Sequence, residues 1–172
     1  MKNFYTRCIH TPLGMMQVVA DDHGLHFLEF IDQKDFQNQQ SHFVQQGRLI
    51  EDVHGNIVLD LVEKELDLYF LGKLYTFSVP VILHGTDFQK QTWSVLQTIL
   101  CGHTLSYQQL AHAVSVLNGH RAVANANSKN KIAIIVPCHR VIMSHGSLGG
   151  YAGGVQKKEW LIAHEKTMLD RQ

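Results

Sequence analysis

The sequence predicts an α+β protein of two small domains, and three observations support this fold class. The N-terminal half has three short segments rich in Val, Phe, Leu and Ile, broken by turn signals and followed by a helical pattern. The C-terminal half has mainly helical patterns. The halves also differ in charge: residues 1–84 hold six Lys and Arg and eleven Asp and Glu, whereas residues 85–172 hold nine and four.

These patterns place the domain boundaries near the middle of the chain. We expect an N-terminal domain at residues 1–80, a linker at 81–86 and a C-terminal domain at 87–172. A basic half beside an acidic half is typical of a nucleic-acid-facing domain joined to a non-binding partner. The alternative is a chance segregation of solvated surface charge.

Size and composition exclude several classes of protein. A chain of 172 residues can bury a core, and its 45% hydrophobic and 17% charged residues are typical of a folded protein. No apolar run approaches the roughly 20 residues of a membrane span, and the N-terminus has no signal-peptide pattern. Cys8, Cys101 and Cys138 are odd in number and widely spaced. They indicate a reducing compartment, with neither a disulfide framework nor a four-ligand zinc site.

In the N-terminal half, residues 3–9, 15–20 and 25–31 are predicted as strands, and the polar residues 32–47 as a loop with a helical piece. Asn56 is a candidate cap for a helix that runs to about Gly72. Four apolar residues of this helix share one face by their spacing: Val58, Val62, Leu66 and Tyr69.

The C-terminal half is predicted to begin with three helices. Asp87 is expected to cap the first, whose apolar stripe consists of Phe88, Val95, Leu96 and Ile99. Ser106 and Gln109 form a capping box for the second helix. A short turn leads to a third helix, roughly residues 119–127, so that the last two helices resemble a helix-turn-helix.

The third helix combines small and polar side chains. Its alanines allow a close approach of another surface, and Arg121 near its start is well placed to reach DNA. Packing in a core would explain the alanines, but it would not explain the polar residues among them. Small side chains suit the minor groove, which is only about 6 Å wide.

The chemistry centres on the stretch from Ile134 to Val141, where an apolar run, predicted to be a buried strand, ends at Pro137-Cys138-His139-Arg140. A thiol becomes a strong nucleophile when a neighbouring imidazole or positive charge helps to deprotonate it. The chain must turn directly after Pro137, or a water must bridge, for Cys138 and His139 to act together. A buried structural cysteine is the alternative interpretation.

A longer series of motifs resembles the O6-alkylguanine-DNA alkyltransferases, also called methylated-DNA–protein-cysteine methyltransferases. The N-terminal half resembles this family only through Thr11-Pro12-Leu13-Gly14 and Gly24-Leu25. The motifs of the C-terminal half follow the family order: Ser106-Tyr107-Gln108-Gln109-Leu110-Ala111, Arg121-Ala122-Val123, Asn130, Pro137-Cys138-His139-Arg140-Val141-Ile142, Gly149-Gly150-Tyr151-Ala152-Gly153-Gly154 and Lys158-Glu159-Trp160-Leu161.

This resemblance implies a ribonuclease-H-like α/β domain followed by a mostly helical, winged helix-turn-helix-like domain that binds DNA and accepts the alkyl group. It implies single-turnover transfer of an alkyl group from O6-alkylguanine, and also from O4-alkylthymine, in duplex DNA to Cys138. Glu165 would orient His139, His139 would deprotonate Cys138 through water, Tyr107 would donate a proton toward the leaving guanine, and Asn130 would brace the active-site turn.

The resemblance also implies a minor-groove DNA interface and a base pocket. Arg121 would fill the space of the extruded base. The other expected DNA contacts are Tyr107, Ala122, Ala126, Asn127 and Lys129. The expected pocket residues are Leu148, Val141, Tyr151, Ala152 and Gly153.

No cofactor and no metal are expected. Some members of the family bind a structural zinc in the N-terminal half, where this chain has three histidines and Cys8. Asp21 and Asp22 stand where a second thiol would be needed, so we interpret the histidines as scattered surface residues: His10, His23 and His26.

We expect a monomer without a membrane segment, located in the cytoplasm as in bacteria, or in the nucleus if the source is eukaryotic. Two other function classes are open. A non-catalytic lesion-recognition protein of the alkyltransferase-like type would lack the acceptor thiol. A thiol hydrolase would use His and Asn or Asp from distant positions and would turn over repeatedly.

Overall fold

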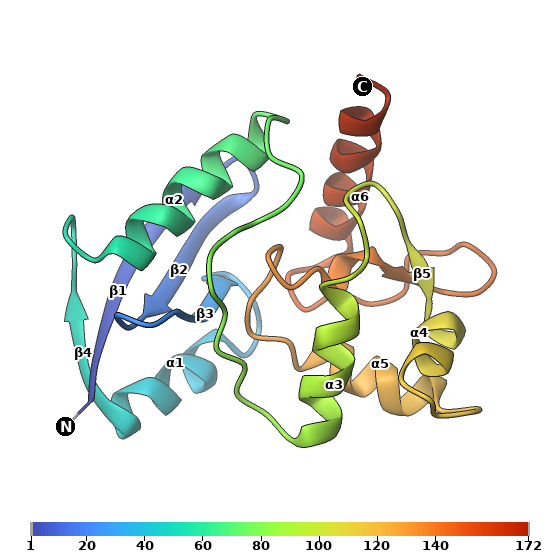
Figure 1. Ribbon diagram of the computed structural model, residues 1–172, viewed down its shortest axis with the longest axis horizontal. Coiled ribbons are helices and arrows are strands. Elements are labelled where there is room, and N and C mark those ends of the chain that lie inside the picture. Colours follow the sequence, from blue (N-terminus) through green and yellow to red (C-terminus); the bar gives the residue numbers. More distant parts are fainter. Residues whose placement is uncertain (1, 172) are drawn as a thin grey trace. The chain divides into compact units, whose positions relative to one another are not determined.

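The computed structural model describes residues 2–171 and divides the chain into two compact units (Figure 1). Unit 1 is Met1–Leu83 and unit 2 is His84–Gln172. Unit 1 is built on a four-stranded mixed sheet, and unit 2 is mainly helical. The α+β class predicted from the sequence is confirmed.

The sheet of unit 1 has the strand order β3-β2-β1-β4. Strands β1 (Lys2–Thr11), β2 (Gly14–Ala20) and β3 (Leu25–Phe30) form an antiparallel meander that matches the three predicted strands. The edge strand β4 (Gly47–Glu51) pairs parallel to β1 and was not predicted. It is only five residues long and directly follows a Gln-rich helix, so its sequence shows no strand periodicity.

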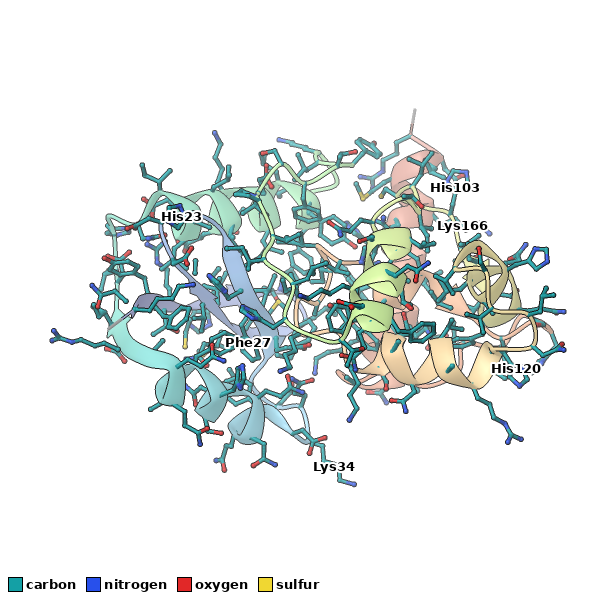
Figure 2. The ribbon with its side chains drawn as sticks, turned by 60° about the horizontal axis from the view of Figure 1, so that its bottom comes forward. His23, Phe27, Lys34, His103, His120 and Lys166 are labelled. Atoms are coloured by element: carbon teal, nitrogen blue, oxygen red, sulfur yellow. The ribbon has the colours of Figure 1, made fainter. Side chains whose placement is uncertain are left out.

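Helix α1 (Phe36–Gln46) packs on one face of this sheet. Side chains alternate between the two faces of a strand, so Phe4, Val19 and Phe27 lie on the same face in the observed register. They form a buried hydrophobic cluster with Phe43 of α1. Figure 2 labels Phe27, one member of this cluster. The polar segment 32–47 is therefore mainly helical, and Phe43 and Phe36 pack α1 against the sheet.

Helix α2 (Ile57–Phe70) lies along β1 and β2 (Figure 1). The side chain of Asn56 accepts a hydrogen bond from the Leu59 N–H, as its predicted role as a helix cap requires. Arg7 of β1 points to the face opposite Phe4, where it binds Asp60 and Glu63 of α2 at 2.7 and 2.6 Å. The apolar stripe of α2 is buried as predicted: Val58, Val62, Leu66 and Tyr69.

Part of the predicted linker belongs structurally to unit 1. The Leu25 N–H donates to the Pro80 carbonyl, and the Ile82 N–H donates to the Leu25 carbonyl, both at 2.8 Å. Residues 80–82 therefore extend the sheet edge beside β3.

One interpretation of the N-terminal histidines was wrong. His26 is a buried residue, and its Nε2 lies 2.9 Å from Oδ2 of Asp21. Asp21 also binds Lys2, so an ion-pair cluster explains this histidine. His10 and His23 are exposed, as expected.

Unit 2 begins with helix α3 (Asp87–Leu96). Its cap is Thr86, which forms a capping box with Gln89, so the predicted cap at Asp87 was one residue too late. Ile99 lies beyond the end of α3 but is still buried, together with Leu96. The remaining elements of unit 2 are β5 (Leu105–Ser106), α4 (Tyr107–Ala113), α5 (His120–Ser128), a 3-10 turn η1 (Cys138–Arg140), β6 (Val141–Ile142) and α6 (Val155–Leu169).

Helices α4 and α5 contact each other and are joined by a tight turn. The predicted capping box of Ser106 and Gln109 starts α4. Ser115 and Asn118 take positive φ angles of 62° and 58° in the turn. Asparagine tolerates this conformation better than most residues because its short polar side chain can bond locally. The helix pair leaves one side of α5 exposed.

Within residues 2–171, none of the helices is long and apolar enough to span a membrane.

Candidate active site

The apolar run before Cys138 forms a buried turn, not the predicted strand. The Ile135 N–H donates to Ala133 and the Val136 N–H donates to Ile132, and Ile134 has a φ of 70°. A positive φ is unfavourable for a β-branched residue and costs about 1–3 kcal/mol. The surrounding packing has to hold this turn in place.

Asn130 supplies that support. Its side-chain N–H groups donate to the carbonyls of Ile132 and Val136 at 3.3 and 2.8 Å, and its oxygen accepts from the Ile132 N–H at 3.0 Å. One buried side chain thus satisfies three backbone groups that a strand partner would otherwise bind. The structure therefore brings Asn130 to the turn that precedes Cys138.

The chain turns again directly after Pro137. Cys138, His139 and Arg140 form the single 3-10 turn η1, and all three are buried. The carbonyl of Cys138 accepts a hydrogen bond from the side chain of Asn127 on α5 at 3.3 Å. This turn allows Cys138 and His139 to take part in one site, because they no longer alternate across a strand.

His139 and Glu165 form a fully buried pair. His139 Nε2 lies 2.8 Å from Glu165 Oε1. A carboxylate can only accept, so Nε2 carries the proton and Nδ1 is left as the acceptor. Nδ1 is buried and has no hydrogen-bond partner within residues 2–171. The pair therefore presents a proton-accepting nitrogen inside unit 2.

The surroundings hold Glu165 charged and His139 neutral. Burial alone would raise the pKa of Glu165, but the hydrogen bonds from His139 and Arg140 and the positive charge of Arg140 hold it well below its usual range. Burial lowers the pKa of His139, the bond to Glu165 opposes this change, and the charges of Arg140 and Lys158 add to it. A neutral imidazole beside a carboxylate is suited to accept a proton.

Tyr107, at the start of α4, stands near the thiol. Burial raises the pKa of its hydroxyl, and the charge of Cys138 contributes in the same direction. Gly149 has a φ of 70°, and a Cβ there would lie 3.4 Å from the Tyr107 ring. The loop of residues 146–154, here called the glycine loop, can thus run past this ring with its backbone close to it.

Lys158 of α6 binds two backbone carbonyls near the Cys138 turn. It is completely buried, and its Nζ donates to the carbonyls of Val141 and Gly150 at 2.6 and 3.2 Å. Burial lowers the pKa of Lys158 to about 8, although the negative charge of Cys138 opposes this change. Val141 is buried beside the lysine. The other predicted pocket residues are half-buried, or exposed in the case of Ala152: Leu148, Tyr151, Ala152 and Gly153.

The predicted DNA contacts divide between two sides of α5. Arg121, Ala122 and Lys129 are exposed. Ala126 and Asn127 are buried, because Ala126 accepts a hydrogen bond from the indole of Trp93 and Asn127 holds the Cys138 turn. Their side chains are not on the exposed side that a DNA contact requires, so we correct their assignment to internal support of the site.

Some residues of the site were not assigned roles from the sequence. Arg140 donates to Glu165 from Nε and Nη2, each at 2.9 Å, and the Gly102 N–H donates to the same carboxylate. Figure 2 labels His103 and Lys166, the residues that follow Gly102 and Glu165 in the sequence. The burial of Lys158 could have been predicted from the sequence. Its spacing from Leu161, Glu165 and Met168 places all four residues on the same face of α6, and this face is buried.

Across residues 2–171, no group of three or more His, Cys, Asp or Glu side chains is arranged to hold a metal ion.

Two family models match the chain. Residues 87–167 match the DNA-binding domain of 6-O-methylguanine DNA methyltransferase, and residues 4–83 match its ribonuclease-like domain. The methylated-DNA–protein-cysteine methyltransferase of Salmonella typhimurium is 41% identical over 165 residues, which cover 94% of this chain and 95% of the relative. That of Methanosarcina mazei is 36% identical over 96% of this chain and 99% of the relative.

Solved structures give the same relationship. The crystal structure of Mycobacterium tuberculosis O6-methylguanine methyltransferase matches with a TM-score of 0.84 and 35% identity, over 96% of this chain and 94% of the other. Mycobacterium tuberculosis OGT in complex with DNA matches with a TM-score of 0.84 and 34% identity, over 97% and 94%.

Proposed function

The chain belongs to the methylated-DNA–protein-cysteine methyltransferase family, and we propose that it repairs DNA by moving an alkyl group from O6-alkylguanine onto its own Cys138. The observation that carries this assignment is the turn η1, which sets Cys138 beside the buried pair of His139 and Glu165. A thiol next to a neutral, oriented imidazole is the arrangement of an activated nucleophile.

The first step is deprotonation of Cys138. His139 Nδ1 is the acceptor, and we propose that a water molecule carries the proton to it, since Nδ1 makes no direct hydrogen bond within residues 2–171. Glu165 stabilises the imidazolium that forms. An unperturbed thiol has a pKa near 8.5, so assistance from a base matters most at neutral pH.

The second step is alkyl transfer. The thiolate attacks the alkyl carbon, a new S–C bond forms, and the bond from that carbon to O6 of guanine breaks. The electron pair of the broken bond remains on guanine, and Tyr107 donates a proton toward the anionic base. Because the product is a thioether, which water does not readily hydrolyse, each protein molecule reacts once.

The base pocket is proposed to lie between the glycine loop and the Cys138 turn. Lys158 fixes the carbonyls of Val141 and Gly150 at two sides of this region. Tyr151 would offer an apolar face to the alkyl group. Ala152 and Gly153 leave room for a flat base, and Leu148 completes the wall.

Duplex DNA is proposed to contact the exposed side of α5 through its minor groove. Arg121 would occupy the space of the extruded nucleotide, Ala122 would allow the close approach, and Lys129 would bind phosphate. Extrusion is needed because a protein nucleophile cannot reach O6 inside the base stack. We also propose O4-alkylthymine as a second substrate, a monomeric state and a cytoplasmic location.

A lesion-recognition protein without transfer activity is the second candidate, but the presence of Cys138 favours transfer. One incubation with duplex DNA carrying radiolabelled O6-methylguanine separates the possibilities. Transfer predicts one label per protein molecule, held covalently. Label that stays on the DNA would indicate recognition alone, and label released over many cycles would indicate a thiol hydrolase.

A further inference from the structure

The proposed reaction assigns no role to Arg140, the last residue of the turn η1. It is only 6% exposed, so it is not available to bind DNA phosphates. Its Nε and Nη2 each donate to a different oxygen of Glu165 at 2.9 Å, and its Nη1 donates to the carbonyl of Ile99. A guanidinium bound in this forked way has one orientation, because two parallel bonds fix its plane.

Glu165 is consequently shared between several donors. Oε1 accepts from His139 and from Arg140, whereas Oε2 accepts from Arg140 and from the Gly102 N–H at 2.9 Å. The thiol of Cys101 also bonds to this carboxylate. The carboxylate that orients His139 is therefore itself oriented by Arg140 and by the segment that follows α3.

We propose that Arg140 is a positioning residue for alkyl transfer: its fork fixes both oxygens of Glu165 and thereby keeps His139 oriented and unprotonated. This inference rests on the proposed function, because it assigns Arg140 a task in the same site. It does not require Arg140 to touch DNA, the lesion or the thiol.

The charges around the pair explain why such a residue is needed. A carboxylate alone beside an imidazole would raise the pKa of His139, and a histidine that is already protonated cannot take a proton from Cys138. Burial acts most strongly against that effect, and the charges of Arg140 and Lys158 act in the same direction as burial. Cys101 is a further titratable group at Glu165, and burial raises the pKa of its thiol to about 11, so that it stays neutral.

Arg140 also connects three segments of unit 2. It lies in η1, it binds α6 through Glu165, and it binds the end of the α3 segment through Ile99. A movement of any one segment would change the angle between Glu165 and His139. The orientation of the imidazole thus depends on the two hydrogen bonds from Arg140 to Glu165. The positive charge of Arg140 by itself would not fix this orientation.

The test compares Arg140→Met and Arg140→Lys with the wild type in the full chain. The Met variant removes the charge and the fork, while the Lys variant keeps the charge and loses the fork. The exposed Arg171 gives a matched control, since Arg171→Met removes the same charge from the surface of unit 2. Two quantities are measured: the titration of the His139 imidazole by NMR, and the pH dependence of the reaction with free O6-benzylguanine.

For Arg140→Met we expect the His139 titration to move upward by about one pH unit, so that transfer at pH 6.5 slows by at most about fivefold and recovers at higher pH. We expect an intermediate shift for Arg140→Lys and none for Arg171→Met. An unchanged His139 titration in Arg140→Met would overturn the proposal. A wild-type titration in Arg140→Lys would show that charge alone suffices, and would overturn the role of the fork.

Two further outcomes have a defined meaning. If Arg140→Met does not fold, Arg140→Lys decides the question by the same criteria. If the wild type transfers no alkyl group, the proposed function fails, but the NMR titration still tests whether Arg140 controls His139.

Discussion

Glu29 in unit 1 and Glu165 in unit 2 are both buried, and the two carboxyl groups are held in opposite states. Glu29 of β3 is 3% exposed, and burial raises its pKa to about 8, opposed only by a hydrogen bond from the Phe30 N–H. Glu165 of α6 is 1% exposed, but His139 and Arg140 hold its pKa well below the usual range. Burial is similar in the two cases, so the partners decide the charge.

This difference shows where the chemistry of the chain resides. Glu29 stands opposite Gln17 in the sheet, a neutral setting in which a protonated carboxyl is the stable form. Glu165 accepts hydrogen bonds from the charged guanidinium of Arg140 on both oxygens, so its ionised form is the stable one. We infer that Glu29 serves packing in unit 1 and that Glu165 serves proton transfer in unit 2.

The largest expected effect comes from removing the charge of Glu165. Glu165→Gln should slow alkyl transfer at pH 7 about 100-fold, because general base assistance to the thiol is lost. Much of the deficit should be recovered near pH 9, where the thiol ionises without help. Rates with free O6-benzylguanine across pH 6–9 check this. Glu29→Gln is the matched control and should react at the wild-type rate, whereas an equal deficit of Glu165→Gln at every pH would assign Glu165 to structure alone.

The second effect concerns the basic surface of unit 2. Arg121→Ala should slow repair of duplex DNA about tenfold, a loss of about 1.4 kcal/mol in transition-state stabilisation. Its reaction with free O6-benzylguanine should change little, because a free base needs no extrusion. Arg48 is an exposed arginine of β4 in unit 1, and Arg48→Ala serves as the control. Similar losses on both substrates would mean that Arg121 supports the fold of α5.

The third effect concerns the stability of unit 1. The folded-state pKa of Glu29, about 8, lies above its unfolded value near 4.3, so its contribution is fully present at low pH and is lost as pH rises toward 8. Glutamine has no such loss. The free energy of unfolding of Glu29→Gln relative to wild type should therefore rise by about 3 kcal/mol between pH 5 and pH 8.

Chemical denaturation at the two pH values checks this prediction. Both tryptophans, Trp93 and Trp160, lie in unit 2, so their fluorescence follows unit 2 while circular dichroism follows both units. The change should occur in the circular dichroism transition. A pH-independent difference between the two proteins would show that Glu29 is ionised in the fold.

The smallest effect separates stability from reactivity within unit 1. Asn56→Ala removes the side-chain cap of α2 and should reduce stability by about 1 kcal/mol. The rate of transfer to Cys138 should stay at the wild-type value at 25 °C. A slower reaction with free O6-benzylguanine would show that unit 1 contributes to the active site directly.

Much of the regular structure follows from the sequence because local patterns determine it. The three antiparallel strands, the buried face of α2 and the capping box of α4 each leave a local pattern in the sequence, of short spacing or adjacent capping residues. Strand β4 is different, since its pairing with β1 is a long-range contact that five residues do not encode. The cap of α3 was predicted at Asp87 and lies one residue earlier, at Thr86, because both residue types are good helix caps.

The active site is less predictable from the sequence, because it also depends on contacts between segments that are far apart in the chain. The pairing of His139 with Glu165 was expected from the apolar face of α6 and from the family motif. The turn before Cys138 was not, because a run of apolar residues indicates a strand, although the family resemblance gave Asn130 the role of bracing the active-site turn. The burial of Asn127 was also not predicted, because the sequence does not show which side of α5 faces the core.

The most direct test of the central claim is to locate the transferred group. Wild-type protein is reacted with duplex DNA containing O6-methylguanine, digested and analysed by peptide mass spectrometry. We expect one added methyl group per chain, on the peptide that contains Cys138, and none in Cys138→Ser. A methyl group on Cys8 or Cys101, or methylation of the Cys138→Ser protein, would contradict it.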